Sequence, residues 1–289
     1  MTTALTSHTF SPDMATVIFN SDKLFGVSSS FVGRKPSNED EYDSKITPHG
    51  GLFAIYDGHG GPQISTYLKR NLLRRINDDD DDTNLSLFLE LDDEMKRMIS
   101  SVGTSGSTMT LVIPKKINNV WEITTVNLGD SPAFLIQRDQ YKTLITYHNP
   151  TDIEEMTRIQ MAGGIVGWSS GCNRVCGLAM SRAFGDYRKY THSFLQLDIK
   201  DKGVIAEPSI STHQAKNGDF ILIASDGLTE PKEMTPEFIS LFLYEKWNNS
   251  PKNTTVLKEI AQDLIIRSGQ FGSRDNISVT LICLSVENQ

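Results

Sequence analysis

Residues 51–61 of the chain read Gly51-Leu52-Phe53-Ala54-Ile55-Tyr56-Asp57-Gly58-His59-Gly60-Gly61. The apolar run Leu52–Tyr56 predicts a buried β-strand, and the strand ends directly at the carboxylate of Asp57. Gly58 comes next, and a glycine lets the backbone turn so that its own carbonyl oxygen can face the same point as the acid. We therefore expect a rigid strand that presents an acidic side chain at its end.

The same order of residues recurs later in the chain. An uninterrupted apolar run, Phe220–Ala224, is followed by Ser225, Asp226 and Gly227. Asp-Gly is also a common turn pair, so one such ending often only terminates a strand. Carboxylate and carbonyl oxygens are the ligands that Mg2+ and Mn2+ prefer, and several such endings together favour a metal site. Four acidic stretches lie next to predicted strands: Asn38-Glu39-Asp40, Asp57-Gly58, Ser225-Asp226-Gly227 and Arg274-Asp275-Asn276.

Composition and charge narrow the class of protein. The chain has 289 residues, of which 38% are hydrophobic, and we expect one domain over residues 1–289 with residues 1–23 as a short N-terminal extension. A net charge of -8 argues against binding nucleic acid through bulk electrostatics. No secretory signal and no run of about 18 apolar residues occurs. We expect a monomer that has no membrane partner and lies in the cytoplasm or the nucleus.

The hydrophobic pattern predicts strands and helices in blocks rather than in strict alternation. The expected strands are Leu24–Val32, Leu52–Tyr56, Ser107–Ile113, Val120–Leu128, Ala133–Gln137, Phe220–Ala224 and Ile277–Ser285. Helices are expected after Pro62, over Leu85–Met98 and over Thr255–Ser268, where Gly269 would end the helix. Another helix is expected after a Thr151–Glu154 capping box, with Ile153 buried. A further helix is expected to begin at Thr235, with Leu241 in its apolar stripe. Such blocks indicate the α+β class, in which helices cover a core of sheets.

Four further motifs occur together with the acidic stretches. They are Gly106-Ser107-Thr108, Leu128-Gly129-Asp130-Ser131, Ser181-Arg182-Ala183-Phe184-Gly185-Asp186 and Ala206-Glu207-Pro208. In the order of its motifs and in their residues, the chain resembles the metal-dependent serine/threonine protein phosphatases of the type 2C, or PPM, family over about residues 24–285. The resemblance implies a four-layer α-β-β-α sandwich, with two mainly antiparallel sheets flanked by helices and the metal ions at one edge between the sheets. It also implies hydrolysis of phosphoserine and phosphothreonine in phosphoprotein substrates.

The resemblance implies a role for each acidic residue. Two Mg2+ or Mn2+ ions would activate a water molecule, with Asp57 as the bridging ligand. Asp226 and Asp275 would complete the sphere of one ion, the carbonyl of Gly58 would touch the other, and Glu39 and Asp40 would act through bound waters. Asp130 matches the position of a third ion shared with Asp226. A turn acid that follows a strand explains Asp130 equally well.

Two further positions concern the substrate phosphate and the leaving group. His59, two residues after the bridging acid, is expected to donate a proton to the departing alkoxide, whereas we expect Asp186 to be mainly structural. Most family members carry an arginine four residues before the glutamate of the Glu-Asp pair, where it grips the phosphate. This chain has Lys35 there, beside Arg34, so either residue is a candidate for phosphate binding.

Two other functions share parts of this pattern. A pseudophosphatase that binds or masks phosphoproteins would keep the fold but lose acids of the metal site, and here Asp57, Asp226 and Asp275 are all present. A metal-dependent phosphodiesterase or nuclease would use similar ions, but the acidic charge balance and the motif order disfavour it. The irregular region 187–203 matches a variable flap and is expected to influence substrate choice, while the run Asp78–Asp82 is expected to be a loop.

Overall fold

A computed structural model of the chain describes residues 13–77, 85–98, 101, 103–138, 140–187, 189–190, 196–197 and 203–284. The run Asp78–Asp82 and most of the region 187–203 lie outside the described residues, so neither prediction about them is addressed. Among the described helices, none combines the length and the apolar composition needed to cross a membrane.

Two antiparallel sheets form the centre of the molecule. The six-stranded sheet has the order β1 (Ala15–Asn20), β2 (Leu24–Phe31), β18 (Ile277–Leu284), β17 (Phe220–Ala224), β9 (Ala133–Gln137) and β10 (Gln140–Thr143). The five-stranded sheet has the order β16 (Ser209–Ala215), β8 (Val120–Leu128), β7 (Met109–Ile117), β4 (Gly50–Tyr56) and β3 (Glu41–Thr47). Because β1 pairs with β2, part of the stretch expected to be a mere extension is an edge strand of the first sheet.

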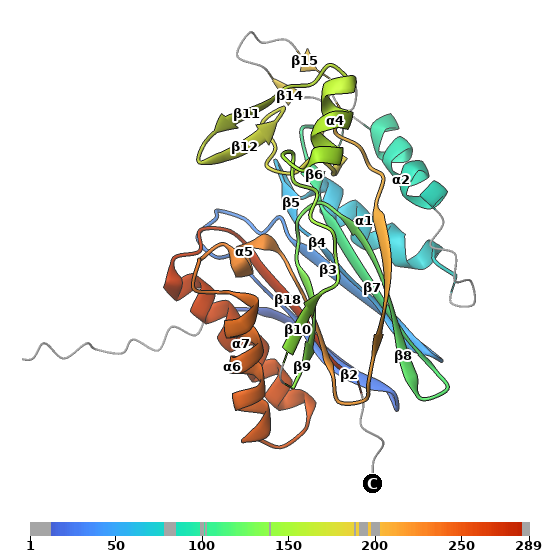
Figure 1. The fold of residues 1–289 in the computed structure, drawn as a ribbon, viewed down its shortest axis with the longest axis vertical. Helices are drawn as coiled ribbons and strands as arrows, with labels where there is room; N and C mark the ends of the chain where they lie inside the picture. Colours follow the sequence, from blue (N-terminus) through green and yellow to red (C-terminus); the bar gives the residue numbers. More distant parts are fainter. Residues whose placement is uncertain are drawn as a thin grey trace, which may run out of the picture.

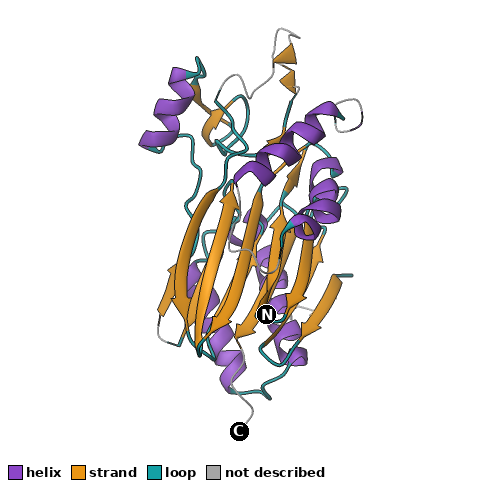
Figure 2. Cartoon of the chain, turned by 90° about the vertical axis from the view of Figure 1, so that its right-hand side faces the viewer, coloured by secondary structure: helices purple, strands orange, loops and turns teal. Residues whose placement is uncertain are grey.

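Helices cover the outer face of each sheet, as Figures 1 and 2 show. Helices α1 (Gln63–Arg75) and α2 (Leu85–Arg97) pack on the five-stranded sheet, and α6 (Pro236–Asn248) and α7 (Thr254–Phe271) pack on the six-stranded sheet. The predicted α-β-β-α layering is confirmed. The smaller elements are β5 (Gly58–His59), β6 (Gly106–Ser107), α4 (Ile153–Met161), β11 (Val166–Ser169), β12 (Cys172–Val175), β13 (Phe184–Gly185), β14 (Lys189–Tyr190), β15 (Gln196–Leu197) and α5 (Asp226–Thr229). Of these, α4, β11, β12, β14 and β15 lie toward the upper end in Figure 1.

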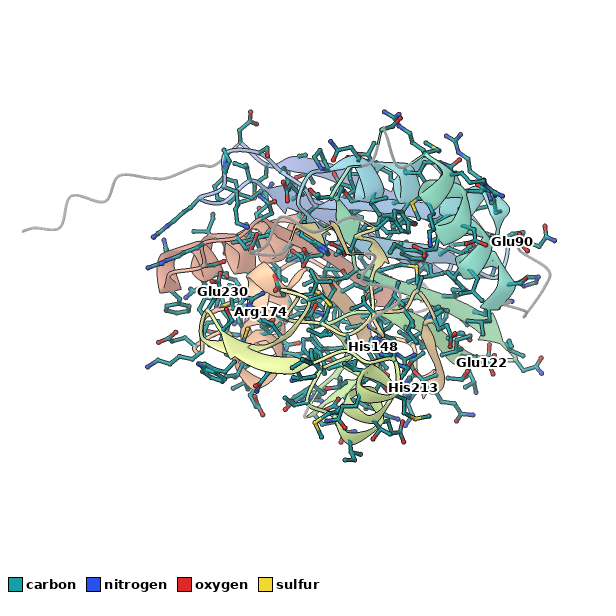
Figure 3. All side chains as sticks on the ribbon, turned by 90° about the horizontal axis from the view of Figure 1, so that it is seen from above. Glu90, Glu122, His148, Arg174, His213 and Glu230 are labelled. Atoms are coloured by element: carbon teal, nitrogen blue, oxygen red, sulfur yellow. The ribbon has the colours of Figure 1, made fainter. Side chains whose placement is uncertain are left out.

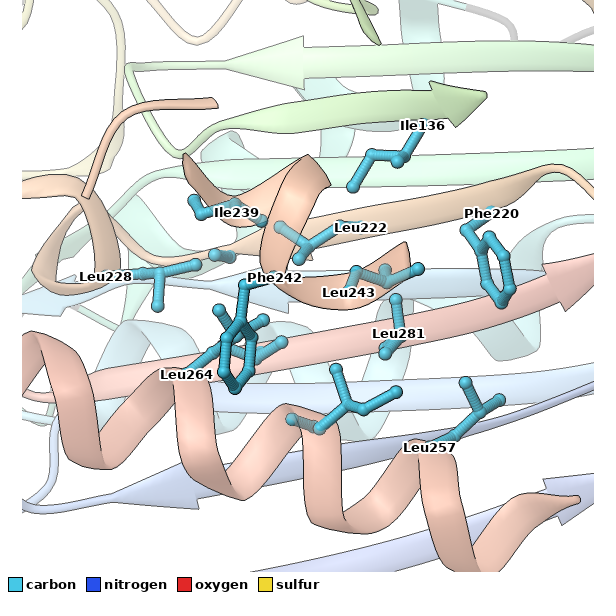
Figure 4. Packing of buried hydrophobic residues seen from close by; sticks show 14 of the residues in the cluster. Ile136, Phe220, Leu222, Leu228, Ile239, Phe242, Leu243, Leu257, Leu264 and Leu281 are labelled. Carbon is cyan, nitrogen blue, oxygen red and sulfur yellow. The ribbon is translucent and has the colours of Figure 1, made fainter. Parts of the chain in front are cut away.

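Each interface between layers has its own hydrophobic core. Phe53 and Trp121 of one sheet meet Leu135 and Ile223 of the other in the central core, and all four are almost fully buried. Figure 4 shows the core between the six-stranded sheet and helices α6 and α7. Burial of apolar surface is worth about 25 cal/mol per Å2, so these three cores hold the strand ends in place and supply rigid supports for side chains at the sheet ends.

The structure corrects several predicted helix details. Helix α4 begins at Ile153 with Asp152 at its N-cap, so the predicted capping box is wrong; Thr151 instead donates to the Asn149 side chain through its N–H and its hydroxyl. Ile153 is 71% exposed because α4 buries its opposite side through Ile159. Leu241 is likewise 72% exposed.

Helix α7 also differs from its prediction. It continues through Gly269 to Phe271, and Gly272 ends it in the left-handed region with a φ of 111°. By contrast, Thr235 caps α6 as predicted, because its side chain accepts a hydrogen bond from the N–H of Phe238.

Candidate metal centre

Strands from both sheets deliver acidic side chains to one end of the sandwich. Asp57 follows β4 of the five-stranded sheet, and Asp226 follows β17 of the six-stranded sheet. In Figure 1, β5 and α5, which continue from these two strands, lie near the upper ends of the sheets. Three more acids flank other strands close to this point: Asp40 before β3, Asp130 after β8 and Asp275 before β18.

Direct hydrogen bonds hold this end of the two sheets together. The N–H of Asp226 donates to Oδ2 of Asp57 at 3.2 Å, which joins the two Asp-Gly turns across the sheets. The hydroxyl of Ser278 donates to Oδ2 of Asp40 at 2.8 Å, so this buried carboxylate is tied to β18. A side chain at Gly58 would place its Cβ 2.2 Å from the carbonyl oxygen of Glu39, and this close approach requires glycine.

Asn276, which sequence reasoning did not single out, fixes the loop that carries Glu39. Its side-chain oxygen accepts from the N–H of Glu39 at 2.9 Å, and its amide nitrogen donates to the carbonyls of Val32 at 2.7 Å and Ser37 at 3.0 Å. Three backbone groups of a loop more than 200 residues away in sequence thus converge on one side chain. Its place directly after Asp275 is the only sequence signal for this role.

The acids oppose one another electrostatically. Burial first, and then the charges of Asp226, Asp40 and Asp130, raise the pKa of Asp57 well above its ordinary value. Asp226 reaches solvent at one side, yet burial by its surroundings and the nearby Asp130 and Asp275 raise its pKa to about 8. Burial, together with the charge of Asp275, raises the pKa of Asp40 to about 7. Negative charge is therefore concentrated here without enough positive charge to balance it.

These residues fit a divalent cation by chemistry. Oδ1 of Asp130 is buried and has no hydrogen-bond partner among the described residues, so this oxygen is available to a bound cation. Within the described part of the chain, no three His, Cys, Asp or Glu side chains form a closed ligand group. The carboxylates repel one another, and a bound cation would bring them closer by coordinating several of them at once.

Lys35 engages the centre through one of its acids. Its Nζ lies 2.8 Å from Oδ1 of Asp275. Partial burial acts to lower the pKa of Lys35, but the hydrogen bond and the charge of Asp275 outweigh it and raise the pKa. Gly33, with a φ of 63°, turns the chain close against the backbone of Asp275 and so brings Lys35 there. Arg34 is exposed and forms no hydrogen bond or ion pair with the described residues.

His59 is held by a fully buried acid. Its Nε2 lies 2.7 Å from Oδ2 of Asp186, a residue 127 positions later in the chain. Gly106 makes this contact possible, because a Cβ there would lie 2.1 Å from Oδ2 of Asp186 and 2.3 Å from Nε2 of His59. The sequence predicted a mainly structural role for Asp186, and in the structure this residue orients the ring of His59.

A second histidine supports the turn that carries Asp130. Nδ1 of His148, labelled in Figure 3, accepts from the N–H of Gly129 at 2.9 Å, and its Nε2 lies 2.8 Å from the hydroxyl of Ser209. Burial first, and then the charge of Arg182, lowers the pKa of His148 to about 4. A neutral ring with Nδ1 as acceptor must carry its proton on Nε2, which therefore donates to Ser209. His148 thus positions the backbone just before Asp130.

The fold and the centre together define the class of the protein: a two-sheet sandwich that gathers acids between its sheet ends, suited to hard divalent cations. Residues 6–277 match the family model for protein phosphatase 2C, and the chain belongs to this family. The sequence resemblance to type 2C phosphatases is thereby confirmed.

Known relatives agree with this assignment. The chain is 32% identical over 271 residues to the rice "Probable protein phosphatase 2C member 13, mitochondrial" (Oryza sativa subsp. japonica) and 29% identical over 276 residues to "Protein phosphatase 1K, mitochondrial" of Xenopus laevis. Each alignment covers 88% of this chain but only 66% of the relative. A solved phosphatase from Toxoplasma gondii superposes with a TM-score of 0.82, covering 96% of this chain and 98% of that one; at 24% identity it shows a shared fold.

Proposed function

We propose that the chain is a protein serine/threonine phosphatase that uses Mg2+ or Mn2+ to hydrolyse phosphoserine and phosphothreonine. The observation that carries the proposal is the group of acids at the ends of strands from both sheets, with raised pKa values and a buried oxygen on Asp130 that has no partner within the described part of the chain. Membership of the protein phosphatase 2C family supports the same activity. The substrates are phosphoproteins.

Each acid has a proposed part in holding the ions. Asp57 would bridge two ions, Asp226 and Asp275 would bind one of them directly, and the carbonyl of Gly58 would face the other. Glu39 and Asp40 would act through water, and Asp130 with Asp226 would hold a third ion. When bound, the ions would supply the positive charge that ionises a water molecule near neutral pH and offsets charge on the phosphate oxygens.

His59 is proposed to protonate the leaving group. Its Nε2 is occupied by Asp186, so the proton to be given up resides on Nδ1. The buried carboxylate of Asp186 fixes the orientation of the ring. The serine or threonine alkoxide needs this proton because it is a poor leaving group.

Metal dependence provides the direct test of the proposed function. Phosphate release from a phosphothreonine peptide should require added Mn2+ or Mg2+ and should stop when EDTA is present, because the proposed ions supply the charge that ionises the attacking water. Release can be followed with a colorimetric phosphate assay. Absence of metal-dependent release would favour the pseudophosphatase, and release only from a phosphodiester substrate would favour the nuclease.

Of the two candidate residues, we propose that Lys35, and not Arg34, binds the substrate phosphate. A divalent ion at Asp275 would compete with Lys35 for that carboxylate, which would leave Nζ able to bind the substrate phosphate. Lys35→Met should therefore raise the KM for a phosphopeptide by about tenfold, the value of one charge-assisted hydrogen bond. Arg34→Met is the matched control and should change KM less than twofold. A larger effect of Arg34→Met would reassign the role, and a change only in the Mn2+ requirement would confine Lys35 to the metal ligands.

A further inference from the structure

A hollow of about 650 Å3 lies between helix α1 and the edge strand β3. Side chains at helical spacing on α1 form one wall, and alternate residues of β3 form most of the other. The lining residues are Thr66, Lys69, Arg70, Leu73 and Arg74 from α1, and Glu41, Asp43, Ser44 and Lys45 from β3.

The hollow carries an excess of positive charge, with four basic and two acidic residues in its lining. Lys69 pairs with Glu41 at 2.6 Å, and Nζ of Lys45 donates to the carbonyl of Ile76 at 3.4 Å. Arg70 and Arg74 are exposed and form no hydrogen bond or ion pair with the described residues. Two guanidinium groups one helical turn apart therefore remain available to carboxylates, which they match with two parallel hydrogen bonds.

The hollow begins next to the metal centre. Glu41 directly follows Asp40 and pairs in the sheet with Tyr56, the residue before Asp57. On the helix side, the hydroxyl of Ser65 donates to the carbonyl of Glu39 at 2.6 Å. From this near end, Lys45 lies four residues along β3, a rise of about 13 Å. Arg74 lies nine residues beyond Ser65 on α1, which gives about the same rise.

We propose that this hollow binds acidic residues of the phosphoprotein substrate, about four positions from the phosphorylated serine or threonine. The inference rests on the proposed function, and it adds a determinant of substrate choice to it. An extended peptide advances about 3.3 to 3.6 Å per residue, so about four residues span the hollow from its near end, at Glu41 and Ser65, to Lys45 and Arg74. The chain carries a net charge of -8, so an acidic substrate is repelled overall and needs such a local positive site.

Position matters because the charges in the hollow are unevenly distributed. Glu41 lies at the near end, Asp43 lies midway along β3 where the charges of Lys69 and Arg74 act on it, and Lys45 lies at the far end. An acidic residue directly beside the phosphorylated residue would meet Glu41, and one about four positions away would meet Arg74 and Lys45. We therefore expect a preference that depends on spacing and not on peptide charge alone.

The test compares phosphothreonine peptides of equal charge. One peptide carries two glutamates three to five residues before the phosphothreonine, a second carries them the same distance after it, and a third carries them directly beside it. With Mn2+ at low salt, one of the two peptides with distant glutamates should have a KM about tenfold lower than the peptide with adjacent glutamates, with kcat unchanged. Arg70→Glu/Arg74→Glu should abolish this difference, and 0.5 M salt should weaken it.

Two controls separate the outcomes. Arg138→Glu/Lys142→Glu makes the same charge change on the β9–β10 hairpin of the other sheet and should leave the preference intact. Hydrolysis of para-nitrophenyl phosphate should be equal in wild type and Arg70→Glu/Arg74→Glu, which shows that the variant is folded. A preference that survives in that variant, or no spacing preference in a wild type that hydrolyses all peptides, would overturn the inference.

A binding measurement keeps the inference independent of catalysis. Fluorescence anisotropy of a labelled, unphosphorylated peptide with two glutamates should show tighter binding to wild type than to Arg70→Glu/Arg74→Glu. If wild type hydrolyses neither para-nitrophenyl phosphate nor phosphopeptides, the proposed function fails, and a binding difference of this kind would still support the acidic-peptide site. Equal binding to both proteins would contradict it.

Discussion

The Asp57→Asn variant should lose about a thousandfold or more in kcat/KM on a phosphothreonine peptide and should nevertheless be more stable without metal. The loss follows because the proposed bridge between two ions would be replaced by a neutral amide. The stability gain follows because burial and then Asp226 raise the pKa of Asp57, so its charge is unfavourable in the folded, metal-free protein. One pKa unit corresponds to about 1.4 kcal/mol, and we expect a gain of about 1 kcal/mol or more in urea unfolding.

The stability of the metal-free protein should also depend on pH, because ionisation of the buried acids is unfavourable in the folded state. The pKa of Asp226 is raised to about 8 and that of Asp40 to about 7, from an ordinary value of 3.8. Between these limits the folded state binds more protons than the unfolded state, so the free energy of unfolding should fall as pH rises from about 4 to 8. Asp57→Asn should flatten this slope, because one of the repelling charges is gone.

Asp93→Asn on the exposed face of α2 provides the matched control for both measurements. It removes the same charge from a residue outside the group of acids and should change neither activity nor the pH slope. Full activity of Asp57→Asn would show that this residue is not an essential ligand. A less stable metal-free Asp57→Asn would show that the acids do not repel one another as the structure indicates.

His59→Gln should lower kcat on a phosphothreonine peptide by about 10^2 to 10^4 and should leave hydrolysis of an aryl phosphate within a few-fold of wild type. A phenolate leaves without a proton, whereas a threonine alkoxide does not, so only the peptide reaction depends on a general acid. Asp186→Asn should show the same selectivity with a smaller loss, because the 2.7 Å contact that orients the ring would be weakened.

The matched control is His49→Gln, which changes an exposed histidine in the turn between β3 and β4. It should affect neither substrate. Stopped assays with both substrates on the same enzyme preparations give the comparison directly. Equal losses on peptide and aryl phosphate in His59→Gln would indicate that His59 supports the metal centre instead of donating a proton.

The central strands of both sheets were predictable, whereas the edge strands were not, including β1, whose run Val17-Ile18-Phe19 lies in the stretch expected to be an extension. Leu52–Tyr56 and Phe220–Ala224 are flanked by sheet neighbours on both sides and read as apolar runs. Strand β3 has the sequence Glu-Tyr-Asp-Ser-Lys-Ile-Thr, and it exists because β4 offers it a hydrogen-bonding edge. Exposure of Ile153 and Leu241 shows a related limit, since a helical stripe reveals which positions share a face but not how much of that face is covered.

The sequence by itself determined which acids end or begin strands, and hence which residues are candidates to hold metal ions, because an apolar run and the acid next to it are local in the chain. Only the tertiary structure decided what those residues contact. The pairing of His59 with Asp186, of Lys35 with Asp275 and of Glu39 with Asn276 joins positions more than 100 residues apart. Such contacts arise when two sheets pack through a common core and their strand ends coincide, and no local pattern encodes that geometry.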